Sequence, residues 1–118
     1  MPRDRILPTS MFRPPADSLG WQPLLDIYAV RDGWLLKVDL AGVRPDEVTV
    51  TIVGRRVTVR GLRRDQSIEE GCCHYRMEIS YSRFERTVEL PDDPGPVAVQ
   101  TESRDGMLLI RIRRNTHP

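Results

Sequence analysis

The most reactive side chains in this sequence belong to two adjacent cysteines and a histidine, Cys72-Cys73-His74. Thiolate and imidazole groups are ligands that zinc prefers, but a structural zinc site needs four of them at suitable spacing. The sequence has no further cysteine and its second histidine, His117, lies near the end, so we predict no metal site. Two neighbouring thiols could also respond to oxidants or form a disulfide between subunits, although we favour unmodified thiols in a reducing cytosol.

No pattern in the sequence indicates an enzyme, because it contains no nucleophile motif and no glycine-rich phosphate loop. The 18 basic and 17 acidic residues give a net charge of +1, which provides no strong field for nucleic acid or membrane. Arginines and aromatic residues are interspersed over residues 75–86, but Glu78, Glu85 and Glu89 balance them, which favours a solvated sheet face. The start does not resemble a signal peptide, and no apolar run reaches the roughly 20 residues that span a bilayer. We therefore predict a cytoplasmic protein without a cofactor, a nucleic-acid partner or a membrane segment.

The elements that would position these side chains are predicted to be β-strands of one domain. From residue 25 onward, apolar and polar residues alternate with period two, and turn sequences such as Arg31-Asp32-Gly33 interrupt the alternation. Because no stretch is convincingly helical, we predict an all-β antiparallel sandwich. The predicted strands are 25–30, 34–40, 48–53, 56–61, 75–81, 84–90, 97–101 and 107–113, with a turn at 44–47 and a long loop at 62–73.

The sequence "IRI" at residues 110–112 permits two interpretations, a peptide that docks on a neighbouring molecule or the last strand of the fold. Leu108, Ile110 and Ile112 continue one alternating face directly from the Asp105-Gly106 turn, so we interpret them as core positions of the last strand. The chain then divides into an N-terminal arm (residues 1–24), a sandwich (25–113) and a very short C-terminal tail (114–118).

The arm combines many prolines with scattered apolar residues. Prolines at this density oppose regular structure, yet the segment is too apolar for an ordinary linker, so we predict a flexible, adhesive arm. The alternative is that Phe12 and Trp21 fold back and cover the core. The apolar side chains of the arm are Ile6, Leu7, Met11, Phe12, Leu19 and Trp21.

Four spaced motifs together resemble one known family. They are "DIYAVRDGWLLKVDLAGVRPDEVTV" (26–50), "RRVTVRG" (55–61), "YRMEISYSRFERTVELP" (75–91) and "RDGMLLIRI" (104–112). The combination is similar to the alpha-crystallin domain of the small heat-shock proteins, in particular the bacterial type. The resemblance covers residues 26 to about 113, and it implies an immunoglobulin-like β-sandwich and an ATP-independent chaperone that holds partly unfolded client proteins soluble.

The resemblance also implies a homodimer, in which a strand within the loop before the central motif pairs with the first strand of the partner. That loop would be residues 63–73 and the receiving edge residues 26–30. Arg86 lies in phase with Phe84 and Val88 on the apolar face, where an unpaired cation is costly, so we expect a carboxylate partner at or near the dimer interface. The alternative is a purely local role, in which the side chain snorkels to solvent. The implied dimer interface contains Asp26, Ile27, Tyr28, Ile68, Cys72, Cys73 and Arg86.

Family members usually carry tails with an I-x-I motif that dock in an apolar groove and build larger oligomers. Here only residues 114–118 follow the last strand, so assembly through tails is not predicted and the groove is left for clients. By position, the implied groove contains Val48, Val50, Ile52, Phe84, Val88 and Leu90. Two alternatives stay open: an adaptor that binds one folded partner, and a redox or metal sensor that uses Cys72 and Cys73.

Overall fold

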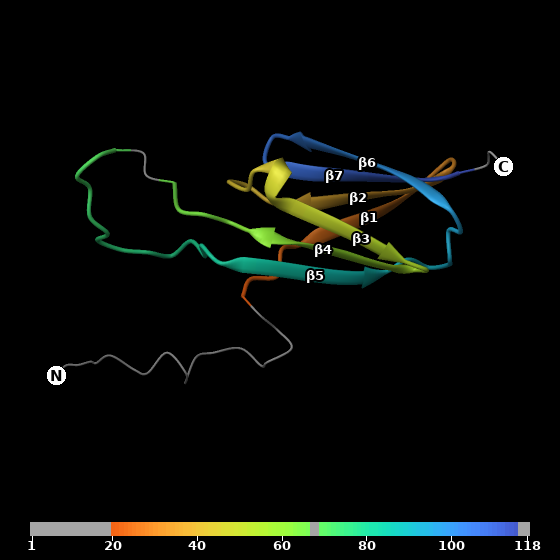
Figure 1. Ribbon diagram of the computed structural model, residues 1–118, viewed down its shortest axis with the longest axis horizontal. Coiled ribbons are helices and arrows are strands. Elements are labelled where there is room, and N and C mark those ends of the chain that lie inside the picture. The colour runs from red at the N-terminus through yellow and green to blue at the C-terminus, as the bar shows by residue number, and fades with distance from the viewer. Residues whose placement is uncertain (1–19, 67–68, 116–118) are drawn as a thin grey trace.

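The computed structural model describes residues 20–66 and 69–115, which form two antiparallel β-sheets packed face to face (Figure 1). The order of strands is β1-β2-β7-β6 in one sheet and β3-β4-β5 in the other. This arrangement confirms the predicted all-β, immunoglobulin-like sandwich. The strands are β1 (Leu25–Val30), β2 (Gly33–Asp39), β3 (Val48–Val53), β4 (Arg56–Leu62), β5 (Arg83–Glu89), β6 (Val97–Arg104) and β7 (Met107–Arg114).

The last strand lies inside its sheet, because β7 pairs with β2 on one side and with β6 on the other. Ile110 is opposite Leu36 on β2, and all of Leu36, Ile110 and Ile112 are fully buried. The interpretation of "IRI" as core positions of a final strand is therefore confirmed.

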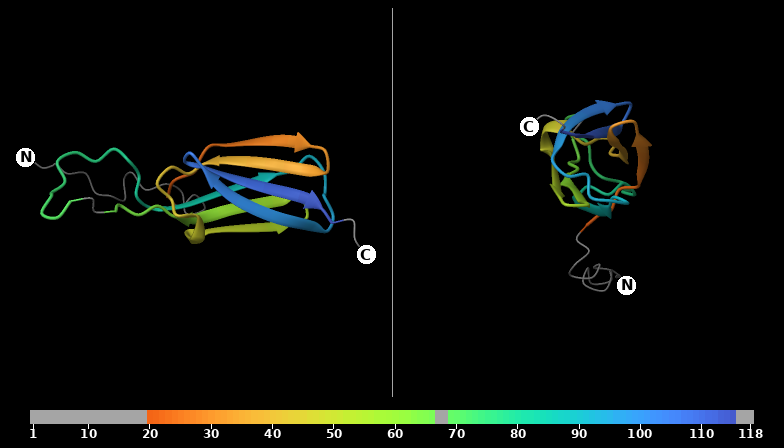
Figure 2. Two further views of the ribbon diagram at one scale, coloured as in Figure 1. Left: turned by 90° about the horizontal axis from the view of Figure 1, so that it is seen from above. Right: turned by 90° about the vertical axis from the view of Figure 1, so that its right-hand side faces the viewer.

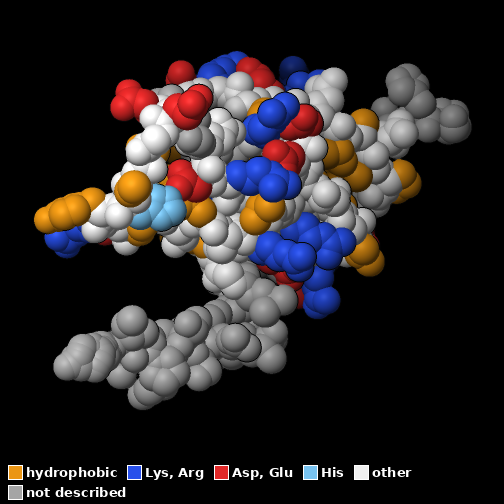
Figure 3. All heavy atoms as spheres, turned by 60° about the vertical axis from the view of Figure 1, so that its left-hand side comes forward, with side chains coloured by type: hydrophobic (Ala, Val, Ile, Leu, Met, Phe, Trp, Pro, Cys, Tyr) orange, Lys and Arg blue, Asp and Glu red, His pale blue; other side chains and the backbone are white. Residues whose placement is uncertain are grey.

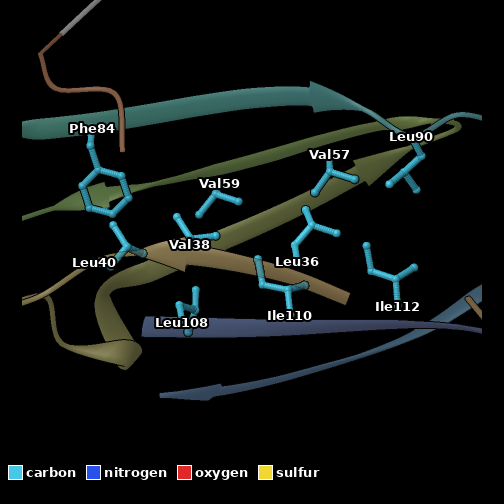
Figure 4. Close-up of a cluster of buried hydrophobic side chains, with 10 residues drawn as sticks. All are labelled: Leu36, Val38, Leu40, Val57, Val59, Phe84, Leu90, Leu108, Ile110 and Ile112. Atoms are coloured by element: carbon cyan, nitrogen blue, oxygen red, sulfur yellow. The ribbon is translucent and has the colours of Figure 1, made fainter. Parts of the chain in front are cut away.

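The core lies between the two sheets and is made of aliphatic side chains, with Phe84 at one end of the cluster (Figure 4). Each fully buried aliphatic or aromatic side chain contributes roughly 1.5 to 3 kcal/mol of transfer free energy. Within residues 20–66 and 69–115 the structure buries no charged or polar residue, so apolar burial dominates this interface. The buried cluster contains Leu36, Val38, Leu40, Val57, Val59, Phe84, Leu90, Leu108, Ile110 and Ile112.

The tight turns follow the predicted turn sequences. The β6–β7 turn places Asp105 at φ 51° and Gly106 at φ 81°, the left-handed pair that a type I′ turn requires. The predicted turn before β3 is a single turn of 3₁₀ helix, η2 (Pro45–Glu47), which begins at a proline as helices often do.

The prediction of a strand over residues 75–81 is wrong for this structure. These residues are part of a loop over residues 63–82 that connects β4 to β5 and projects from one end of the sandwich (Figures 1 and 2). The loop is also longer than the predicted range of 62–73. The physical reason is that a strand needs a neighbouring strand to bind its backbone, and no described strand of either sheet pairs with residues 75–81.

Candidate protein-interaction site

The projecting loop carries apolar side chains that contact no core. Tyr75, Met77, Ile79 and Tyr81 alternate along the part of the loop that returns to β5, residues 75–81, which we call the return limb. Their exposed fractions are 101%, 49%, 58% and 37% in that order. Figure 3 shows hydrophobic side chains standing out on this protruding part of the surface. Exposed apolar side chains grouped in this way are typical of surfaces that bind other proteins.

Arg63 fastens the base of the loop. Its Nε donates a hydrogen bond to the carbonyl of Ser80 at 2.8 Å, and its Nη1 donates to the carbonyl of Ala41 at 3.2 Å. Its backbone N–H donates to the carbonyl of Ser82 at 3.0 Å. The guanidinium also lies 3.7 Å from the ring centroid of Trp21, a cation–π contact. One side chain therefore connects both limbs of the loop, the β2–β3 connection and the segment that precedes β1.

Trp21 packs against the sandwich, as the alternative interpretation of the arm anticipated. Its ring stands edge-on to Phe84 with centroids 5.4 Å apart, and its backbone N–H donates to the carbonyl of Arg83 at 3.0 Å. Gly20 permits this approach, because it has φ 73° and a Cβ there would lie 1.9 Å from the Arg83 oxygen. The other apolar arm residues, Ile6, Leu7, Met11, Phe12 and Leu19, lie outside the described residues.

The predicted receiving edge is open in this structure. β1 pairs only with β2 among the described strands, so its outer edge presents unpaired backbone donors and acceptors. Ile27 packs against the core, whereas Asp26 and Tyr28 are exposed. The Tyr28 ring lies 5.4 Å from Lys37 Nζ, and a hydrogen bond and charge interaction with Tyr28 raise the pKa of Lys37.

Arg86 is half-buried, and its Nη1 donates to the carbonyl of Pro23 at 2.9 Å. Within the described part of the chain no carboxylate forms an ion pair with Arg86. A carboxylate supplied by a second copy remains a prediction.

The structure does not bring the two predicted walls of the groove together. β4 lies between β3 and β5 in the same sheet, so the two strands do not face each other. Phe84 and Leu90 are 2% and 0% exposed and belong to the core. Val48, Val50, Ile52 and Val88 are half-buried and pack against the same core. The sequence-based assignment failed because position along the chain does not reveal which strand lies between two others.

Cys72 and Cys73 are free, exposed thiols on the projecting loop. The neighbouring His74 Nε2 lies 3.3 Å from a carboxylate oxygen of Asp65. In the range the structure describes, no three His, Cys, Asp or Glu residues are grouped so as to hold a metal ion, and no helix is long and apolar enough to span a membrane. Ile68 lies outside the described residues.

With this geometry established, comparison with known proteins shows the family. The model of the Hsp20/alpha crystallin family matches residues 26–118. The chain belongs to the Hsp20/alpha crystallin family. This confirms the resemblance found in the four motifs.

Individual relatives of the Hsp20 family agree. Spore protein SP21 of Stigmatella aurantiaca is 29% identical over 90 residues, covering 76% of this chain and 53% of that protein. The 17.7 kDa class II heat shock protein of Arabidopsis thaliana is 32% identical over 95 residues, covering 79% of this chain and 61% of that protein. The chain thus spans about half the length of these curated relatives. The crystal structure of hspA from Xanthomonas axonopodis superimposes with a TM-score of 0.63 at 31% identity, covering 80% of this chain and 94% of that one.

Sequence reasoning missed two features of this Hsp20 domain. It predicted a strand of the sandwich over residues 75–81 and did not anticipate their exposure, although the strict alternation itself was the signal that this segment needs a pairing partner. It also did not single out Arg63, because nothing in the sequence indicates that Ser80, Ala41 and Trp21 meet around one guanidinium.

Proposed function

We propose that this protein is a cytoplasmic, ATP-independent holdase whose building block is a dimer made by exchange of the projecting loops. The observation that carries the proposal is that one chain presents both an exposed apolar return limb and a β1 edge with no neighbouring strand among those described. Binding, rather than catalysis, is the proposed activity, and it is driven by apolar burial without nucleotide.

The positions of the loop and β1 restrict how two copies can exchange loops. β1 begins at the end of the sandwich from which the loop leaves, and it runs away from the loop (Figure 2). A two-fold axis perpendicular to the strands turns the second copy so that the two loops point in opposite directions, and each can then reach the other copy's β1. An axis parallel to the strands would point both loops away from both β1 edges. Each loop therefore enters beside the start of β1 of the second copy, and its return limb runs antiparallel to that strand.

The length of the loop is sufficient for this pairing. The six residues of β1 span about 20 Å at about 3.3 Å per residue. From Tyr81 back to Glu70 an extended chain spans about 36 Å by the same rise. The difference of about 16 Å is available to cross between the two sandwiches.

Client capture is assigned to the apolar residues of the arm, Ile6, Leu7, Met11, Phe12 and Leu19, together with apolar surface that the dimer leaves open. Trp21 contacts Phe84 and the carbonyl of Pro23 accepts a hydrogen bond from Arg86, so both residues belong to the sandwich. A deletion that tests the arm alone therefore removes residues 1–19 and stops before Gly20. We expect this variant to remain a folded dimer and to lose most of its suppression of client aggregation, measured by light scattering of several heat-denatured enzymes.

A matched variant keeps the arm length and replaces its five apolar residues with serine; it should behave like the deletion. Undiminished protection by both variants would contradict the assigned role of the arm. Protection of a single native protein, without protection of diverse unfolded ones, would instead indicate the adaptor.

A further inference from the structure

We infer that the acidic tip of the loop, Glu69 and Glu70, binds the arginines beside the β1–β2 turn of a second copy of this chain. The inference rests on the loop exchange proposed above and names a contact that fixes its register. It is carried by two surfaces of opposite charge, which lie far apart in one copy and come together in the exchanged dimer.

The tip carries uncompensated negative charge. The chain reverses direction at residues 69–71, and both Glu69 and Glu70 are exposed. The other carboxylates of the loop have local partners, because Asp65 Oδ2 lies 3.3 Å from His74 Nε2 and Glu78 forms an ion pair with Arg76. In contrast, no ion pair involves Glu69 or Glu70 within the described residues. The tip of the loop therefore carries two carboxylates without an ion-pair partner among the described residues, whereas most other charged side chains of the loop have one.

The β1–β2 turn carries uncompensated positive charge. Arg31, Asp32, Arg111 and Arg113 surround a hollow of about 170 Å³ beside this turn, at the end of the sandwich opposite the loop. Arg111 already has a partner in Glu102, whose Oε1 accepts a hydrogen bond from its Nη1 at 2.7 Å. Arg31 and Arg113 form no ion pair with any described residue, and Asp32 offsets only one of these two charges. The hollow therefore offers free guanidinium groups to a carboxylate.

The direction of exchange places these two surfaces together. A return limb that runs antiparallel to β1 brings its tip to the end of β1, where the chain turns at Arg31. Of the estimated reach of about 36 Å for residues 70–81, about 16 Å is available for the crossing, and the remaining distance of about 20 Å equals the length of β1, so the tip reaches this turn. By symmetry the contact forms twice in each dimer, and it opposes slippage of the return limb along the β1 edge.

A charge exchange between two variants tests the contact. In E69R/E70R and in R31E/R113E each homodimer sets like charges against each other, and the dimer dissociation constant should rise about tenfold or more. In a mixture of the two variants, both contacts of the heterodimer are attractive again. Native mass spectrometry of differently tagged chains should therefore show predominantly heterodimer, with an affinity near that of the parent.

The matched control, E85R/D92R, makes the same change of charge at exposed positions outside the loop and the turn. In a mixture with R31E/R113E it should show no preference for the heterodimer. If the parent forms a tight dimer that I79D disrupts, but the two test variants pair at random, the tip contact is overturned and the loop exchange is not. A parent that stays monomeric, or a dimer that I79D does not affect, would overturn both. Raising the salt concentration should weaken the parent dimer and have a smaller effect on a dimer that lacks the contact.

Discussion

The strand β7 and the return limb carry the same kind of sequence and have opposite environments. Apolar and polar residues alternate in both, yet Ile110 and Ile112 are 0% exposed whereas Met77 and Ile79 are 49% and 58% exposed. β7 lies between two strands of its own chain, and the return limb lies beside none. A period-two pattern therefore indicates that a segment needs a pairing strand and an apolar cover, but it does not indicate which molecule provides them.

The largest expected effect separates the two segments by their contribution to folding. Ile110→Ala leaves a cavity between the sheets and should lower the free energy of unfolding by about 2 to 5 kcal/mol. Ile79→Ala should change it by less than about 0.5 kcal/mol, because the side chain is exposed in a single copy. Urea unfolding at concentrations below the dimer dissociation constant measures both. Equal losses would mean that Ile79 packs against its own sandwich.

The reverse is expected for association. Ile79→Asp should raise the dimer dissociation constant about a hundredfold, since burying an isoleucine contributes roughly 1.5 to 3 kcal/mol and a buried carboxylate is unfavourable. Val53→Asp is the matched control, because Val53 is 70% exposed at the end of β3, away from the loop and β1. Sedimentation over a range of concentrations gives both constants. A similar effect of the two substitutions would argue against the return limb as the interface.

A smaller effect on stability is expected at Arg63, where the projecting loop joins the sandwich. Arg63→Ala removes two hydrogen bonds to carbonyls and the contact with the Trp21 ring, and should cost about 1 to 2 kcal/mol. Arg63→Lys keeps the charge but not the planar fork, so it should recover only part of the loss. Hydrogen exchange at the Trp21 amide, which bonds to Arg83, reports the result. Unchanged protection of this amide in the alanine variant would show that Trp21 is held without Arg63.

The smallest effect concerns pH. Hydrogen bonds from Arg111 and then Arg104 lower the pKa of Glu102 on β6. The stability that Glu102 contributes is therefore complete above its unfolded-state pKa and is lost as the pH falls through its lower pKa in the folded protein. Glu102→Gln should flatten this part of the curve of thermal midpoint against pH. An identical acid slope in both proteins would assign the acid sensitivity to other carboxylates.

Much of the fold could be predicted because the turns and the two-residue period are local properties. Asp105-Gly106 and Arg31-Asp32 mark the hairpins, and Leu36 and Ile110 lie on the inward faces that the alternation predicts. The errors concern relations between distant segments. The sequence does not show that β4 separates β3 from β5, or that the backbone of Pro23 reaches Arg86. The motifs indicated the family, while the limb that carries the exposed apolar face required the structure.

The central position of β7 in its sheet has a consequence for synthesis on the ribosome. β2 is translated early, but its second neighbour in the sheet is β7, Met107–Arg114, so β2 has a free edge until nearly all of the domain has emerged. During that interval the inward faces of Leu36 and Val38 lack their cross-strand partners Ile110 and Leu108. The four-stranded sheet therefore closes late in translation, and the nascent chain itself exposes apolar surface that other proteins can bind.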